Sequence, residues 1–171
     1  MNRIMVIGCG GAGKSTFSRQ LHRRTGIPLI HLDQHYWKEG WVESEKEEWT
    51  ERVAELVSGD NWIMDGNYGG TFDIRMSRAT VIVFLDRSSW LCLYRVFRRV
   101  FDNYGRSRAD MASGCPERFS LSFLHYVASY NFVRRPGVLK RLAECPPSVQ
   151  TFVLTKESEV QSFLRTFVPL G

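Results

Sequence analysis

The sequence lacks the features of a membrane protein and of a small protein stabilised by zinc or disulfide bonds. Within its 171 residues, no apolar run is long enough to span a bilayer, and the first apolar stretch, residues 4–7, is too short for a secretory signal. The four cysteines form no C-x-x-C pair, which argues against a zinc site and a disulfide framework. Internal repeats and low-complexity tracts are also missing. We therefore expect a cytoplasmic protein with reduced thiols and no membrane contact.

Carboxylates are scarce between residues 87 and 141, where eleven Arg or Lys residues face only three acidic residues. This half of the chain favours an anionic partner, which is either a polyphosphate held under a lid or the backbone of a nucleic acid. Most of the bases are Arg, whose planar guanidinium suits phosphate in both cases. The sequence has no helix-turn-helix or zinc-finger signature to read DNA bases, so we rank DNA binding second.

The strongest motif is the glycine-rich stretch GCGGAGKST, which fits the P-loop pattern G-x-x-x-x-G-K-[ST]. A short β-branched run precedes it and a helical stretch follows it, which is the order that phosphate binding requires. We expect Lys14 to reach the β- and γ-phosphates of ATP and the Ser15 hydroxyl to be the protein ligand of Mg²⁺. The predicted nucleotide-binding residues are Gly8, Gly10, Gly11, Ala12, Gly13, Lys14, Ser15 and Thr16.

Strand-like and helix-like patterns alternate along the whole chain. This alternation predicts an α/β, P-loop NTPase three-layer sandwich with a mainly parallel, five-stranded sheet in a single domain, residues 1–171. The pattern breaks at about residues 104–116, where glycine, proline and polar residues predict a helical lid insertion. The strands are expected at residues 3–7, 27–32, 62–65, 81–86 and 149–154, and the main helices at 16–25, 44–58, 72–77, 121–132 and 157–167.

Two local signals mark helix starts. Ser44 and Glu47 have the spacing of a capping box, and Ser88 or Ser89 could cap the helix that follows the fourth strand. That helix separates a stripe rich in aromatic residues from a face that carries arginines. We expect four arginines of this region to close over the phosphates, with a solvated basic face as the alternative; they are Arg95, Arg99, Arg106 and Arg108.

Asp33 and Asp65 each end a predicted strand. Because ligands bind outside the carboxyl ends of parallel strands, both carboxylates are expected on the same rim as the P-loop. Asp33 could accept a proton from a hydroxyl substrate or contact Mg²⁺ through water; ordering the following loop is the alternative. Asp65 is expected to orient Mg²⁺ waters or the loop of Gly66, Asn67 and Tyr68. Trp37 either walls the substrate site or packs its loop onto the body.

With these residues laid out, the chain resembles the adenylate-kinase-like P-loop kinases. It is most similar to the bacterial group labelled DNA topology modulation proteins, over nearly its whole length. The resemblance rests on residues 4–8 with the P-loop, on the stretches at 27–33 and 37–41, and above all on WIMDGNYGG at 62–70. It implies phosphoryl transfer from ATP, while the group's name implies a link to DNA supercoiling that the residues themselves do not carry.

The chain also departs from that family. In nucleoside monophosphate kinases the motif after the third strand runs Asp-Gly-Phe-Pro-Arg, so Asp65 and Gly66 match but the arginine that holds the acceptor phosphate is missing. Arg75 is a possible substitute. Ser15 stands where adenylate kinases usually have glycine, which is more like kinases of small hydroxyl compounds.

These observations predict an ATP- and Mg²⁺-dependent kinase that phosphorylates a small acceptor, with a slight preference for a nucleotide or a nucleoside. The alternative is a nucleotide-gated, DNA-binding regulator that affects DNA topology.

Overall fold

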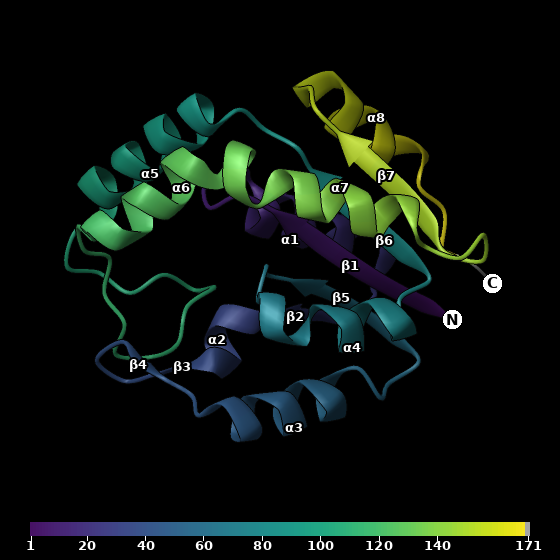
Figure 1. Cartoon of the computed structure of the whole chain (residues 1–171), viewed down its shortest axis with the longest axis horizontal. Helices are drawn as coiled ribbons and strands as arrows, with labels where there is room; N and C mark the ends of the chain where they lie inside the picture. The colour runs from purple at the N-terminus through teal and green to yellow at the C-terminus, as the bar shows by residue number, and fades with distance from the viewer. Residues whose placement is uncertain (170–171) are drawn as a thin grey trace.

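A five-stranded parallel sheet forms the centre of the protein (Figure 1), as described by a computed structural model over residues 1–169. The strand order is β2-β5-β1-β6-β7, so the P-loop strand β1 occupies the middle. The predicted α/β class and five parallel strands are confirmed. The strands are β1 Asn2–Gly8, β2 Leu29–His31, β5 Asn61–Asp65, β6 Val81–Leu85 and β7 Gln150–Leu154.

The central strands are apolar because helices cover both of their faces. Met5 of β1 lies between Met64 of β5 and Ile82 of β6, and all three side chains are fully buried. The edge strand β7 has a more exposed pattern, since only one neighbour pairs with it. This register places the carboxyl ends of β1, β2, β5 and β6 together at one edge of the sheet.

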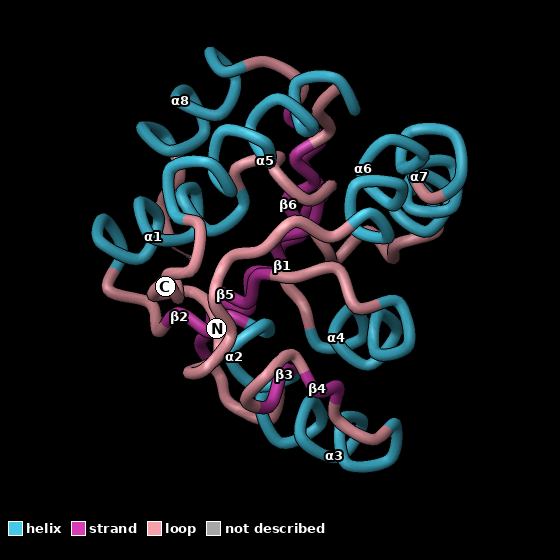
Figure 2. Tube along the Cα trace, turned by 90° about the vertical axis from the view of Figure 1, so that its left-hand side faces the viewer, coloured by secondary structure: helices cyan, strands magenta, loops and turns pink. Residues whose placement is uncertain are grey.

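Helices form a layer on each side of the sheet (Figure 2). On one side lie α1 Lys14–Thr25 and α8 Glu157–Thr166. The other side holds α3 Lys46–Leu56, α4 Phe72–Arg78, α6 Leu121–Val133 and α7 Arg135–Ala143, while α5 Ser89–Asn103 packs along α6. A short 3-10 turn, Gly69–Thr71, precedes α4. Within residues 1–169, no helix is long and apolar enough to cross a membrane.

The chain after β2 is more ordered than the sequence suggested. Helix α2, Leu32–Tyr36, starts directly after the strand, and a small hairpin of β3 Trp37–Lys38 and β4 Val42–Glu43 follows it. The predicted capping box of α3 is wrong, because the Ser44 hydroxyl donates to the Tyr36 carbonyl (2.6 Å) and Glu45 takes the cap position. The predicted Ser88 cap is confirmed, since its hydroxyl accepts the Leu91 N–H at 3.3 Å.

Residues 104–120, here called the lid segment, connect α5 to α6 without forming a helix. They consist of turns and irregular chain, so the helical part of the lid prediction is wrong. The segment runs down to the β3–β4 hairpin (Figure 1), where Gly40 N–H donates to the Gly114 carbonyl and Trp41 Nε1 donates to the Pro116 carbonyl, both at 3.0 Å. A small apolar cluster seals this contact: Met111, Ala112 and Cys115 with Trp37 and Trp41.

Helix α5 buries a different face from the one its aromatic residues mark. Its buried side chains include Cys92, Val96 and Val100, whereas Trp90 and Phe101 are exposed. An amphipathic helix ordinarily turns its apolar stripe to the core. Here the small residues do so, because α5 lies close against the P-loop and leaves no room for aromatic rings.

Candidate active site

A cavity of about 1670 Å³ opens at the carboxyl edge of the sheet. Its walls come from the P-loop, the ends of β2 and β5, helices α5 to α7 and the lid segment. Topology explains this convergence, since parallel strands place all of their carboxyl ends, and the loops that follow them, at one edge. The wall includes these predicted residues: Gly10, Gly11, Ala12, Gly13, Lys14, Ser15, Thr16, Asp33, Trp37, Asp65, Gly66, Asn67, Tyr68, Arg95, Arg99 and Arg108.

The P-loop is held in a tight, glycine-dependent conformation. Gly11 has φ 82°, and a Cβ there would lie 2.5 Å from the Cys92 carbonyl oxygen on α5, so only glycine fits. Lys14 folds back along the loop, and its Nζ donates to the carbonyls of Gly8 (2.9 Å) and Cys9 (3.1 Å). The loop therefore wraps around its own lysine and leads into the positive end of α1.

Gly8 and Asn67, which were predicted separately as binding residues, contact each other and support the P-loop. Gly8 N–H donates to Asn67 Oδ1 at 3.0 Å, and Asn67 Nδ2 donates to the Tyr126 hydroxyl at 2.7 Å. Asn67 thus ties the P-loop strand to the loop after β5 and to helix α6. This position makes Asn67 a positioning residue for the P-loop, although its side chain also reaches the cavity.

Asp33 lies in the first turn of α2, directly after β2, and faces the cavity that Lys14 shares. Burial raises the pKa of its carboxyl above the ordinary range, while a hydrogen bond from the Tyr68 hydroxyl and the charge of Lys14 act in the opposite direction. The side chain remains half-buried, because one side stays open to the cavity. Asp33 is thus a positioned carboxylate with a raised proton affinity, which suits a general base.

His31 and Asp65 form a buried pair at the ends of β2 and β5. His31 Nδ1 is 2.9 Å from Asp65 Oδ2, and both side chains are buried. Burial lowers the pKa of His31, but the hydrogen bond and charge of Asp65 outweigh it, so the net pKa is raised. Asp65 is therefore occupied by His31, which was not among the predicted site residues. The contact joins residues 34 positions apart on neighbouring strands, and sequence spacing gives no sign of it.

The lid segment brings a carboxylate to the P-loop. Asp110 pairs with Arg108 at 3.0 Å and lies 4.0 Å from Arg19, and the Ser15 hydroxyl is near enough to lower the pKa of its carboxyl. Burial acts to raise the pKa of Asp110, but these partners lower it overall. The predicted Mg²⁺ ligand Ser15 is thus close to the lid segment. Asp110 entered the sequence analysis only as a charge count.

Arginines and carboxylates alternate around the rest of the cavity. Glu117 of the lid segment is buried and lies 3.0 Å from Arg99 and 2.6 Å from Arg108. Arg95 donates to the Ala12 carbonyl at 3.3 Å, which places its guanidinium beside the P-loop. Three of the four predicted lid arginines therefore converge on the cavity. Arg106 does not, since it is exposed and lies outside the cavity wall.

Arg75 is not placed to hold an acceptor phosphate, the role that the sequence suggested for it. Its side chain is fully buried, and its guanidinium donates to the backbone carbonyls of Gly66 (2.9 Å), Asn67 (2.8 Å) and Tyr68 (2.9 Å). Burial lowers its pKa to about 9, which leaves it charged at neutral pH. With its donors used in this way, Arg75 holds the loop after β5 in shape and has little capacity left for an acceptor phosphate.

Trp37 combines the two roles that the sequence left open. It lines the cavity, and its ring also packs edge-on against Tyr36 and Trp41 at 5.0 and 5.3 Å. Trp41 continues this wall, and the Arg118 guanidinium lies 5.2 Å from the centre of its ring. The part of the cavity beside the β3–β4 hairpin is therefore partly aromatic.

The DNA-binding alternative gains no support from these placements. Of the basic residues between 87 and 141, seven line the cavity and one, Arg135, pairs with Asp86 at 2.8 Å. Arg98 pairs with Asp102 at 3.6 Å. The positive charge is thus directed mostly inward or neutralised. The seven are Arg87, Arg95, Arg99, Arg108, Arg118, Arg134 and Arg141.

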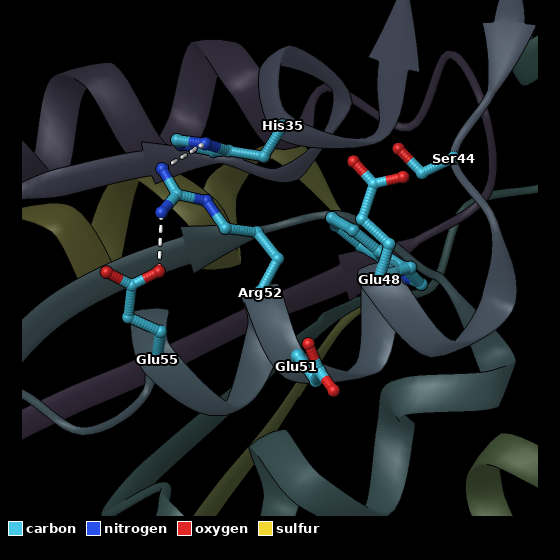
Figure 3. Close-up of a pocket in the computed structure, with 7 residues that line it drawn as sticks. His35, Ser44, Glu48, Glu51, Arg52 and Glu55 are labelled. Atoms are coloured by element: carbon cyan, nitrogen blue, oxygen red, sulfur yellow. Dashed lines mark hydrogen bonds and ion pairs between the residues drawn. The ribbon is translucent and has the colours of Figure 1, made fainter.

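A second hollow, of about 320 Å³, lies between α3 and the elements that carry His35 and Ser44 (Figure 3). Its lining has three glutamates and one arginine, Arg52, which turns to Glu55 and His35. An acidic lining with a paired arginine repels phosphate. The large cavity, which the P-loop lines, is therefore the candidate phosphate site.

Comparison with known proteins identifies the fold. No protein-family model matches the chain, and no curated protein sequence matches it. Among solved structures, it is similar to shikimate kinase from Acinetobacter baumannii in complex with shikimate (TM-score 0.60, 18% identity, 96% of this chain and 89% of that chain). It is also similar to an unliganded sugar kinase from Janibacter sp. HTCC2649 (TM-score 0.54, 15% identity, 96% and 93%). Shikimate kinase from Bacteroides thetaiotaomicron aligns with a TM-score of 0.52, 17% identity, and 96% and 94% coverage. A resemblance to the DNA topology modulation group does not emerge, and the chain has the fold of these small-molecule kinases.

Proposed function

We propose that this protein is an ATP-dependent kinase that phosphorylates a hydroxyl group of a small acceptor. The observation that carries this proposal is the position of Asp33, a half-buried carboxylate that shares the cavity with Lys14 and is held by the Tyr68 hydroxyl. A hydroxyl acceptor must lose a proton as it attacks, and a positioned carboxylate of raised pKa can receive it.

Each part of the cavity has a role in this reaction. The acceptor oxygen forms a bond to the γ-phosphorus, the bond from that phosphorus to the bridging β–γ oxygen breaks, and the hydroxyl proton passes to Asp33. Lys14, Arg95 and Arg99 stabilise the negative charge of the transferring group. The P-loop N–H groups and α1 hold the remaining phosphates.

The residues present also fit Mg²⁺. Within residues 1–169, no group of three or more His, Cys, Asp or Glu residues could hold a metal by itself. Mg²⁺ beside a nucleotide needs only one or two protein ligands, since phosphate oxygens and water complete its shell. The Ser15 hydroxyl is the proposed ligand, with Asp33 and Asp65 near enough to the same cavity to orient bound water. When bound, the ion neutralises charge between the phosphates.

Among acceptors, nucleosides and other polyhydroxylated small molecules rank before nucleoside monophosphates. A monophosphate needs a free arginine at the loop after β5, and Arg75 is engaged by backbone carbonyls there. The aromatic wall of Trp37 and Trp41 supports an acceptor with a planar base or the apolar face of a sugar ring. Shikimate and sugars belong in the test because structurally similar proteins are a shikimate kinase and a sugar kinase.

The test is ADP release from ATP and Mg²⁺ by the purified protein across a panel of nucleosides, nucleoside monophosphates, sugars, shikimate and small alcohols. We expect strong stimulation by one hydroxyl compound. Lys14→Ala should abolish it, and Asp33→Asn should lower kcat by about 100-fold or more, the usual contribution of a general base.

The matched control is Asp73→Asn, which removes an exposed carboxylate on α4 that pairs with Arg141. It should leave the rate nearly unchanged. Slow ATP hydrolysis with no acceptor preference would contradict the proposal. Full activity of Asp33→Asn with every acceptor, in a protein that Lys14→Ala inactivates, would contradict the role of Asp33.

A further inference from the structure

One face of α5 is aromatic and open to solvent. Trp90 is 83% exposed, Tyr94 62%, Phe97 46% and Phe101 84%, and these four residues follow one another at helical spacing. Two exposed rings of the lid segment, Tyr104 and Phe119, extend the face beyond the end of the helix, and Phe119 lies 6.1 Å from Phe97. We call these six residues the aromatic face.

The α5 part of the aromatic face carries almost no net charge, although the protein as a whole has a formal charge of +5. The two charged side chains exposed beside it on α5, Arg98 and Asp102, pair with each other at 3.6 Å. Nucleic acids and acidic membrane surfaces are bound mainly through unpaired basic residues, which the α5 part of this face lacks; Arg106 and Arg118 flank only its lid-segment end. A neutral, aromatic surface instead suits another protein surface of the same character.

We infer that the aromatic face binds a second copy of this chain, with the two α5 helices packed antiparallel across a two-fold axis. The spacing of the four helical aromatics is the reason, because steps of four, three and four residues read the same in both directions. In an antiparallel pair, Trp90 then lies opposite Phe101 of the partner subunit, and Tyr94 lies opposite Phe97 of the partner subunit. A two-fold interface brings the same surface of both copies together, so that surface must be complementary to itself. The spacing of these four aromatic residues meets this requirement.

The exposed area is sufficient for a stable dimer. The exposed fractions of the six aromatic side chains add up to about four complete rings. At about 150–250 Å² for each aromatic side chain, the face offers roughly 600–1000 Å² per copy. A stable interface of standard size buries about 800 Å² per partner, whereas the largest apolar patch of a typical monomer is about 300–600 Å².

The proposed interface also lies directly behind the candidate active site. The opposite side of α5 carries Cys92, whose carbonyl packs against Gly11 of the P-loop, and Arg95, which reaches the Ala12 carbonyl. Dimer formation would therefore immobilise the helix that supports the P-loop of each copy. The inference rests on the exposed face alone and does not depend on the acceptor of the proposed kinase.

Sedimentation velocity of the purified protein tests this inference, up to about 0.1 mM, where an interface of micromolar Kd is saturated. We expect a species of twice the 19.8 kDa mass of one chain. Phe97→Glu should raise the dimer Kd by about 100-fold or more, because each copy loses an aromatic contact near the axis and the two new charges repel. Tyr94→Lys should weaken the dimer similarly.

The double variant Tyr94→Lys with Phe97→Glu provides the sharpest readout. In the proposed register, the lysine of one copy faces the glutamate of the other, so the double variant should recover at least tenfold in Kd over Phe97→Glu. Phe132→Glu is the matched control, since it removes an even more exposed phenylalanine ring (84%) from α6, outside the aromatic face, and should leave the dimer intact. Circular dichroism melting checks that every variant is folded.

Three results would overturn the inference. They are a monomer throughout the concentration range, a dimer that Phe97→Glu leaves unchanged, and a protein that stays monomeric but binds vesicles of neutral or acidic lipid through Trp90 and Phe101. A dimer that Phe97→Glu weakens but the double variant does not restore would overturn the antiparallel register.

Discussion

The hydroxyl of Tyr68 should set the pH at which the proposed kinase becomes active. Tyr68 donates a hydrogen bond to the Asp33 carboxylate, which favours the charged form and holds the pKa of Asp33 below the value that burial alone would give. Tyr68→Phe removes this bond and keeps the ring, which packs against Tyr36 at 4.6 Å and Trp49 at 5.0 Å. The pKa of Asp33 should then rise further.

The magnitude follows from the strength of the lost bond. A hydrogen bond to a charged group contributes about 1.5–3 kcal/mol, and one pKa unit corresponds to about 1.36 kcal/mol. The acidic limb of the kcat/KM profile, which reports the free enzyme, should therefore move up by about 1–2 pH units. In the wild type this limb should already lie above the ordinary pKa of aspartate, because burial raises the pKa of Asp33.

The assay is ADP release at fixed acceptor concentration across the pH range, with kcat/KM fitted at each pH. Tyr36→Phe is the matched control, because Tyr36 belongs to the same ring cluster but gives its hydroxyl to Glu43 at 2.9 Å. Its profile should match that of the wild type. An unmoved acidic limb in Tyr68→Phe, or an equal shift in Tyr36→Phe, would refute the assignment of Asp33 as the proton acceptor.

Three further predictions concern stability. Arg75→Met should lower the free energy of unfolding in urea by about 3 kcal/mol, because it leaves several buried carbonyls without donors; a loss below about 1 kcal/mol would contradict this role. Ser88→Ala should lower the free energy of unfolding by about 1 kcal/mol, because the α5 cap is lost. Glu47→Ala should change it by less than about 0.5 kcal/mol, because α3 has no capping box. Equal losses in the two variants would contradict this contrast. Asp33→Asn should raise the melting temperature at neutral pH and have little effect below the ordinary aspartate pKa, because a carboxyl whose pKa is raised on folding opposes folding only once it ionises. A lower melting temperature of Asp33→Asn at neutral pH would count against the raised pKa.

The chain's local patterns were sufficient to predict its architecture. The P-loop motif, the alternation of apolar runs with helical periods, and the Asp-Gly pair after β5 each depend on residues close together in sequence. Propensity and periodicity act over such short distances, and parallel strands then place Lys14, Asp33 and Asp65 at one edge of the sheet without further information.

Contacts between distant segments decided the rest. The hydrogen bond of Tyr68 to Asp33 spans 35 positions, the bond of Gly8 to Asn67 spans 59, and Arg75 turned inward because the loop after β5 offered it carbonyls. A motif cannot show which partner a polar group finds, since that partner is chosen by packing. The same holds for α5: its sequence marks an aromatic stripe, but the close approach of Gly11 to Cys92 determined that the small residues face inward and the rings face solvent.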